Sequence, residues 1–281
     1  MALRSMRFVE ALPLLLLVAC SKKEPPPPER TAPWPATQSS TRQEVAAQRV
    51  KYVVDTNGEA RLSLKAKEAT PKGRLRVARG ELDVDLADLS RSRGTVSMDV
   101  ASIVMDASEE DGSEQLSQKA RNWLDVGSSR PEAERERLRW ASFEITSIEE
   151  LSSDTPSMGK RVHIEPPDAG ADAGDAAVVS EEGRAITLKA RGRLTLHGFR
   201  VECEIPLRAV FFWDKPTETD ASPKRMTLET RRPFRVALRA HDITARNAAG
   251  TPLAEDAKLI GVRVGREARV ELSLSAHLAG K

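Results

Sequence analysis

The side chains that could carry chemistry are few and widely spaced. They are four histidines and two cysteines: His163, His197, His241, His277, Cys20 and Cys203. No two histidines stand at the close spacing, such as His-x-x-x-His, that a zinc site on one element requires. Cys203 lies within an apolar stripe, where burial raises the pKa of a thiol and disfavours nucleophilic work. We therefore predict no metal site and no catalytic residue among them.

The remaining polar motifs also favour structure over catalysis. Asp83, Asp85 and Asp99 alternate with apolar residues, so we expect them on the solvated faces of strands rather than as an acid–base pair. His197 precedes Gly198, where we expect it to fix a turn by hydrogen bonding rather than to act as a base. The sequence contains no Gly-rich phosphate loop, nucleophile elbow or kinase signature. We predict that the protein is not an enzyme and has no cofactor.

Cys20 is the one residue with a predicted modification. Arg4 and Arg7 precede a short apolar run that ends in Leu17-Val18-Ala19-Cys20. This order resembles the bacterial lipoprotein signal, in which the cysteine is acylated and the preceding peptide is removed. It implies a signal peptide over residues 1–19 and lipidation of Cys20. The run is shorter than the roughly 20 apolar residues of a membrane helix, and Pro13 interrupts it.

The same resemblance implies an address in the cell envelope of a Gram-negative bacterium. Several acyl chains on one cysteine hold a protein on a bilayer very stably. Ser21, in place of an aspartate after the cysteine, favours the outer membrane, facing the periplasm. Residues 20–48 are rich in proline and polar side chains, so we expect a disordered linker there.

Composition limits the remaining classes. The 281 residues are 40% hydrophobic and 31% charged, enough for the core of one domain, which we place at residues 49–281. Forty-four basic and 42 acidic residues give a net charge of +2, and only 4% of residues are aromatic, so a nucleic-acid partner is not indicated. Two cysteines with different predicted roles give no disulfide framework.

The body has the period-two pattern of half-buried strands. Every odd position from Phe199 to Trp213 is apolar, and the same alternation occurs over 186–196, 234–240 and 270–278. Shorter runs lie around residues 62–64, 75–77, 82–86, 96–100 and 143–145. The pattern predicts about eight strands. Their apolar faces require either a second sheet or closure into a barrel, and periodicity alone does not choose between the two.

Two segments depart from this pattern. Residues 113–126 predict the one substantial helix, because Leu116, Ala120 and Trp123 fall at helical spacing, and we expect it to lie across a barrel end. Residues 152–184 include a low-complexity stretch from Pro166 to Asp175 that lacks core-forming side chains. We interpret residues 152–184 as a disordered hairpin insertion.

From about Val50 to the carboxyl end, the landmarks resemble the YceI-like, polyisoprenoid-binding family. The sharpest is Gly192-Arg-Leu-Thr-Leu-His-Gly198, which matches a hairpin motif of that family. Further matching segments are Tyr52 to Asp55, Gly80 to Leu86, Gly94 to Ile103 and Ala120 to Val126. The resemblance implies an all-β fold: an eight-stranded antiparallel lipocalin-like β-barrel with one short helix.

The family resemblance also implies a function, which is to bind a hydrophobic small molecule. The barrel lumen would hold a polyisoprenoid, an isoprenoid quinone or an acyl chain. Alternation selects ten candidate wall residues: Leu188, Leu194, Leu196, Val201, Cys203, Phe211, Val236, Leu238, Leu272 and Leu274. Small residues on the same stripes are compatible with a cavity: Ala190, Ala209, Ala240 and Ala276. The alternative is a non-enzymatic envelope interaction module in which these side chains form a filled core, and alternation fits both.

Overall fold

The computed structural model describes residues 46–66, 70–107, 112–164, 181–214, 222–247, 249, 251–253 and 264–280. The predicted signal peptide, Cys20, most of the linker and the low-complexity centre of the insertion, 165–180, lie outside these described residues. Glu44–Lys281 form one compact unit that contains all the elements below. None of the helices in the described ranges is long and apolar enough to span a bilayer.

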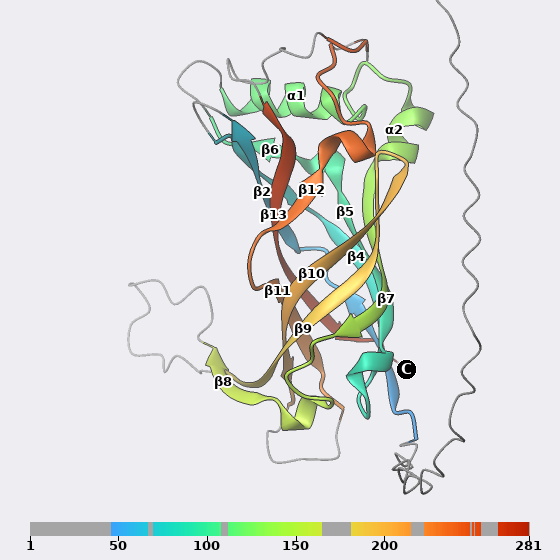
Figure 1. Cartoon of the computed structure of the whole chain (residues 1–281), viewed down its shortest axis with the longest axis vertical. Coiled ribbons are helices and arrows are strands. Elements are labelled where there is room, and N and C mark those ends of the chain that lie inside the picture. The colour runs from blue at the N-terminus through green and yellow to red at the C-terminus, as the bar shows by residue number, and fades with distance from the viewer. Residues whose placement is uncertain are drawn as a thin grey trace, which may run out of the picture. The chain divides into compact units, whose positions relative to one another are not determined.

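Eight antiparallel strands form a closed ring (Figure 1). In ladder order they are β1 (Arg49–Val54), β4 (Ala78–Asp85), β5 (Arg93–Asp99), β7 (Trp140–Glu149), β9 (Glu181–Leu196), β10 (Phe199–Phe212), β11 (Arg225–Thr230) and β13 (Val264–Leu278). The ring closes because β13 also pairs with β1. Closure pairs the backbone groups that an open sheet would leave at its edges. The predicted eight-stranded antiparallel barrel is confirmed.

Residues of β1 join the two ends of the barrel wall. Tyr52 and Val54 pair with Leu278 and Ala276 of β13 on one side, and β1 pairs with β4 on the other. The Tyr52 side chain is fully buried, and its hydroxyl donates to the carbonyl oxygen of Pro223 at 2.8 Å. Burial raises the pKa of this phenol, so the hydroxyl remains a donor.

Extra strands extend the wall at the amino half of β13. That half pairs with β12 (Phe234–Ala237) and with β2 (Glu59–Ala66), which continues to β3 (Lys72–Arg76) and β6 (Val104–Met105). The predicted strand over residues 234–240 is wrong for its last three residues. β12 stops at Ala237, a 3-10 turn, η4, occupies Leu238–His241, and Ala240 is exposed.

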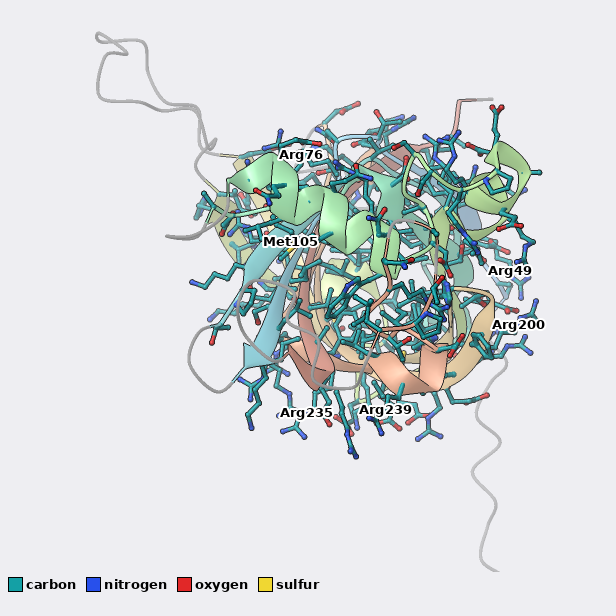
Figure 2. The ribbon with its side chains drawn as sticks, turned by 90° about the horizontal axis from the view of Figure 1, so that it is seen from above. Arg49, Arg76, Met105, Arg200, Arg235 and Arg239 are labelled. Carbon is teal, nitrogen blue, oxygen red and sulfur yellow. The ribbon has the colours of Figure 1, made fainter. Side chains whose placement is uncertain are left out.

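Two helices lie near one end of the barrel (Figures 1 and 2). Helix α1 (Ser113–Trp123) confirms the predicted helix, and its Ser117 hydroxyl accepts a 2.9 Å hydrogen bond from the Met105 backbone of β6. Helix α2 (Glu132–Leu138) was not predicted. Leu138 is its only buried residue, so the segment has no apolar stripe for a periodicity analysis to detect.

The margins of the predicted insertion are ordered strands. β8 (Lys160–Ile164) pairs with the first residues of β9, so the described part of 152–184 is a hairpin base rather than a disordered segment. Val162 and Ile164 pack against Val210 and Phe212 of β10 in a small second apolar cluster. This cluster explains why two even-numbered positions of β10 are apolar.

Gly192 allows β7 and β9 to approach closely. An added Cβ at residue 192 would lie 2.1 Å from the Glu144 carbonyl oxygen and 2.8 Å from Cζ of Phe143. A backbone oxygen cannot move aside as a flexible side chain can. The glycine of the family-like hairpin motif is therefore required by packing inside the barrel.

We predict that Gly192→Ala lowers the free energy of unfolding by about 3 kcal/mol, the upper part of the usual overpacking range. Urea unfolding followed by circular dichroism measures the loss. Gly112→Ala is the matched control, because an added Cβ there meets nothing within 4 Å. It should cost less than about 1 kcal/mol, since only a helix N-cap preference changes. Equal losses in both variants would contradict the packing argument.

Candidate functional site: an apolar cavity within the barrel

A cavity of about 180 Å³ lies inside the barrel, and all 28 residues that line it are hydrophobic. Ala120, Trp123 and Leu124 close it on the side of α1 and the turn after that helix, while Leu238 and Ile243 border it from η4 and the chain that follows. The strands supply the remaining wall. An apolar void of this kind excludes water and accepts apolar molecules.

Strand alternation produces this wall. On β12, Phe234 and Val236 line the cavity, whereas Arg235 between them is exposed. Figure 2 shows Arg200, Arg235 and Arg239 on the outside of the barrel, and all three are exposed. The polar half of the pattern thus faces solvent and the apolar half faces the cavity.

Six of the ten predicted wall residues line this cavity: Leu194, Leu196, Val236, Leu238, Leu272 and Leu274. Leu188 and Phe211 line a second void of about 40 Å³ farther along the barrel. Val201 and Cys203 are half-buried and are not among the lining residues of either void. The Phe143 ring packs over Gly192, the ladder partner of Cys203, and fills the adjacent interior.

The Cys203 thiol has the environment predicted for it. It packs against the apolar core, and burial, with a contribution from Glu202, raises its pKa to about 11. A thiol in this state is a poor nucleophile. The described residues contain no group of three or more His, Cys, Asp or Glu side chains that could hold a metal ion.

Sequence analysis missed several lining residues. Ile205, Leu207 and Phe234 stand on the predicted stripes, and continuing the same alternation would have selected them. Ile103 and Met105 lie just after a 3-10 turn, where no periodic pattern marks the inward side chains. Ala120 and Trp123 of α1 could be selected only by knowing which face of the helix packs on the barrel.

A buried polar cluster, formed by Asp125, His197 and His241, joins the segments around the cavity. His197 Nε2 lies 3.0 Å from Asp125 Oδ2, and its Nδ1 lies 3.1 Å from the His241 carbonyl oxygen. The ring of His197 therefore bridges the Asp125 carboxyl group and the backbone at His241. Arg130 and Arg246 also approach Asp125, at 3.5 and 3.6 Å. These cations offset the cost of burying the carboxylate.

The cluster holds backbone in an unusual conformation. Asp125, His197 and Asp242 all have positive φ, at 55°, 52° and 52°. His197 and Gly198, with φ of 81°, form a two-residue turn between β9 and β10, as a type I′ hairpin requires. The prediction that His197 fixes this turn is confirmed. The cluster thereby links the end of α1, the β9–β10 hairpin and η4, which carry cavity residues Leu124, Leu196 and Leu238.

A second buried polar group, which we call the Asp85–Arg91 lock, lies at the end of β4. Asp85 is fully buried, accepts from the backbone N–H groups of Gln48 and Ala87, each at 3.1 Å, and lies 2.9 Å from Arg91 Nε. Asp99 is also buried, and its carboxylate accepts from Ala101 N and from Arg139. The prediction that these two aspartates are solvated was therefore wrong. They end their strands, where the chain turns and supplies unpaired donors. Asp83 remains half-buried near Arg49.

His241 makes the stability of the folded state depend on pH. Its Nδ1 lies 3.2 Å from the carbonyl oxygens of Leu196 and Phe199 and donates to them. Burial, assisted by nearby His197, lowers the pKa of His241 below the ordinary 6.5. The folded state therefore holds His241 neutral at a pH where the unfolded chain binds a proton. Its contribution to stability is complete above pH 6.5 and decreases as the pH falls through the folded-state pKa.

We predict that His241→Asn flattens the decrease in stability between pH 7 and about pH 5, because the amide keeps a donor near Nδ1 but does not titrate in this range. Thermal unfolding at a series of pH values measures the effect. His163→Asn, at an exposed position, is the control and should leave the wild-type slope unchanged. An unchanged slope in His241→Asn would show that other groups cause the acid sensitivity.

Comparison with known proteins identifies the family of this chain. The YceI-like domain description matches residues 52–276. No curated protein matches the chain. A polyisoprenoid-binding domain from Saccharophagus degradans, implicated in plant cell wall breakdown, shares 14% identity over 82% of this chain and 99% of its own, with a TM-score of 0.48. BcnA from Burkholderia cenocepacia shares 13% identity over 79% of this chain and 98% of its own, with a TM-score of 0.45. Because the domain match covers most of its length, the chain belongs to the YceI-like family.

Proposed function

We propose that this protein binds a lipid in the bacterial cell envelope and holds a polyisoprenoid, an isoprenoid quinone or a long acyl chain inside its barrel. The observation that carries the proposal is the cavity of about 180 Å³ with an entirely hydrophobic lining. The similar domain from Saccharophagus degradans is described as polyisoprenoid-binding, which supports the same ligand class.

The chemistry of the lining selects a hydrocarbon chain. A ligand with polar groups along its length would leave them without hydrogen-bond partners at a cost of about 1–3 kcal/mol each. A hydrocarbon chain instead gains about 0.8 kcal/mol for each buried CH₂. The polar part of an amphipathic ligand would remain at the mouth or outside.

The size of the cavity argues against the alternative of an interaction module with a filled core. At about 24 cal/mol per Å³, an empty void of 180 Å³ costs roughly 4 kcal/mol of stability. Large side chains at a few lining positions would remove this cost. A binding cavity explains why positions such as Ala60, Ala141 and Ala268 remain small.

The proposal includes a membrane anchor. The lipobox ending in Cys20 supports removal of residues 1–19 and acylation of Cys20, with residues 20–48 as a tether to the outer membrane. A tethered barrel in the periplasm would take up and shield a lipid close to the bilayer.

The lumen is tested by native purification of Glu44–Lys281 from the periplasm, followed by organic extraction and mass spectrometry. We expect a near-stoichiometric isoprenoid or long-chain lipid in the wild-type barrel. Leu272→Arg should fold and lose it, because Leu272 lines the cavity at a half-buried position.

Leu116→Arg is the control for this lumen test. Leu116 is fully buried and does not line the cavity, so an arginine there should unfold the domain. A folded wild-type barrel that contains no lipid and also refuses added isoprenoids would contradict the proposal.

The anchor is tested with Cys20→Ser. We expect this variant to lose incorporation of a fatty-acid label and to move from the membrane fraction to the soluble fraction, because serine cannot form the thioether. Cys203→Ser is the matched control and should keep both the label and the membrane location. Equal labelling of the wild type and Cys20→Ser would refute acylation at this residue.

A further inference from the structure

We propose that a layer of three aliphatic side chains, Ile145, Leu207 and Leu228, limits the length of the chain that the barrel accepts. This inference rests on the proposed function, because it assigns a length limit to the same lumen. The ligand class it specifies is an isoprenoid whose buried part ends at this layer. We call Ile145, Leu207 and Leu228 the floor layer.

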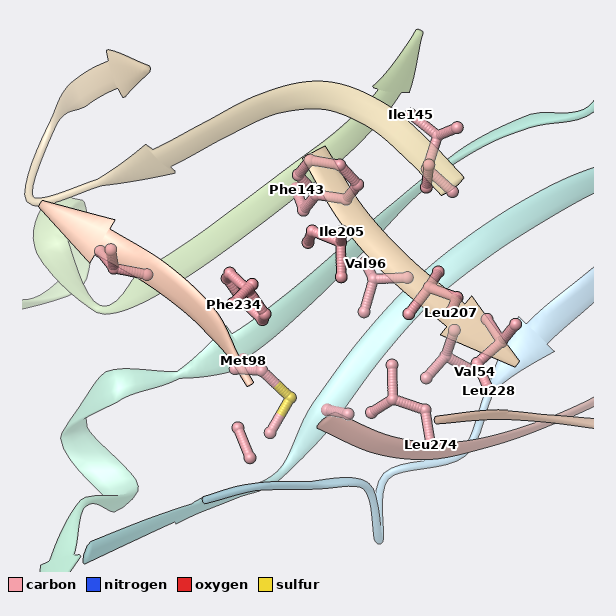
Figure 3. Close-up of a cluster of buried hydrophobic side chains, with 14 of the residues drawn as sticks. Val54, Val96, Met98, Phe143, Ile145, Ile205, Leu207, Leu228, Phe234 and Leu274 are labelled. Atoms are coloured by element: carbon pink, nitrogen blue, oxygen red, sulfur yellow. The ribbon is translucent and has the colours of Figure 1, made fainter. Parts of the chain in front are cut away.

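The floor layer separates the two voids. Its three residues line both the cavity of about 180 Å³ and the void of about 40 Å³, and no other residue lines both. On β10, the inward residues proceed from Ile205 at the larger cavity, through Leu207, to Ala209 at the smaller void. Figure 3 shows Leu207 and Leu228 side by side in the barrel interior. On β10 the layer is therefore one inward residue thick.

Its side chains are buried inside the barrel, because Ile145, Leu207 and Leu228 retain only 9%, 7% and 8% exposure. They therefore occupy the interior between the two voids. A chain end entering from the larger cavity meets these side chains before it can reach the space beyond them.

The space beyond the floor layer is small and mostly apolar. Ala190 and Ala209 leave room there, Phe211, Met226 and Leu89 border it, and Ser92 and Arg93 border it toward the barrel end. Leu89 begins the 3-10 turn η1 (Leu89–Arg91), which is fixed by the Asp85–Arg91 lock. The smaller void is therefore bordered by a firmly held turn. Removing one floor side chain would join this void to the larger cavity and lengthen the apolar space.

This arrangement predicts how affinity depends on chain length. Each additional buried CH₂ strengthens binding about fourfold until the chain end reaches the floor layer. Further units then remain outside, and affinity stops rising. The wild-type barrel should therefore bind isoprenoids with increasing affinity up to a plateau.

The experiment measures dissociation constants of the full chain, with Cys20→Ser to keep it soluble, for farnesol, geranylgeraniol and solanesol, which share one repeating unit and increase in length. With the wild-type floor layer, affinity should stop rising with chain length within this series. Leu207→Ala should move the plateau to a longer chain and strengthen binding of the longer alcohols on the order of tenfold relative to farnesol. Leu228→Ala should act in the same direction.

Two further variants separate a length limit from a general change in the lumen. Ala209→Leu added to Leu207→Ala refills the joined space and should restore the wild-type plateau. Leu75→Ala enlarges only the larger cavity and should leave the plateau where it is. Circular dichroism confirms that each variant is folded before its affinities are compared.

The outcomes distinguish this inference from the function on which it rests. If the wild type binds none of the three alcohols, the proposed function fails. If the wild type binds them but the plateau stays unchanged in folded Leu207→Ala and Leu228→Ala, the floor layer is not the limit and the function stands. A plateau that moves in Leu207→Ala and returns with Ala209→Leu supports the length limit.

Discussion

The enclosed lumen depends on a short ladder that closes the barrel. β1 and β13 share only three residue pairs, Tyr52 with Leu278, Val53 with His277 and Val54 with Ala276. The Tyr52 hydroxyl bond to Pro223 and the His277–Asp55 pair, at 2.6 Å, reinforce this closure. Without it, the apolar faces of eight strands would meet water along two free edges. Ring closure converts one-sided strands into a cavity with a hydrophobic wall.

Buried polar groups then hold the helix and turns that strand pairing does not position. The buried cluster of Asp125, His197 and His241 joins α1, the β9–β10 hairpin and η4 on one side of the cavity. The Asp85–Arg91 lock fixes the turn beyond the smaller void. Buried polar groups are costly unless satisfied, and here most serve backbone donors and acceptors in turns. They hold the segments that border the apolar interior while leaving the larger cavity itself without polar lining.

The sequence predicted the parts of this structure that repeat with a regular period. The alternation from Phe199 to Trp213 gave β10, and Leu116, Ala120 and Trp123 gave α1. It did not predict α2, which buries only Leu138, or the burial of Asp85 and Asp99, because their burial arises where strands end and the chain turns. Six wall residues followed from alternation. The division into two voids did not, because it depends on which inward side chains of β7, β10 and β11 lie between them.

The most direct test of the central claim is methyl NMR of the protein labelled at methionine, with geranylgeraniol added. Met98 and Met105 line the larger cavity, whereas Met158 is 77% exposed on the outer surface. A chain inside the barrel should shift the Met98 and Met105 methyl signals in a saturable way and leave Met158 unchanged. Shifts confined to Met158, or none at the two cavity methionines, would contradict a lipid-binding lumen.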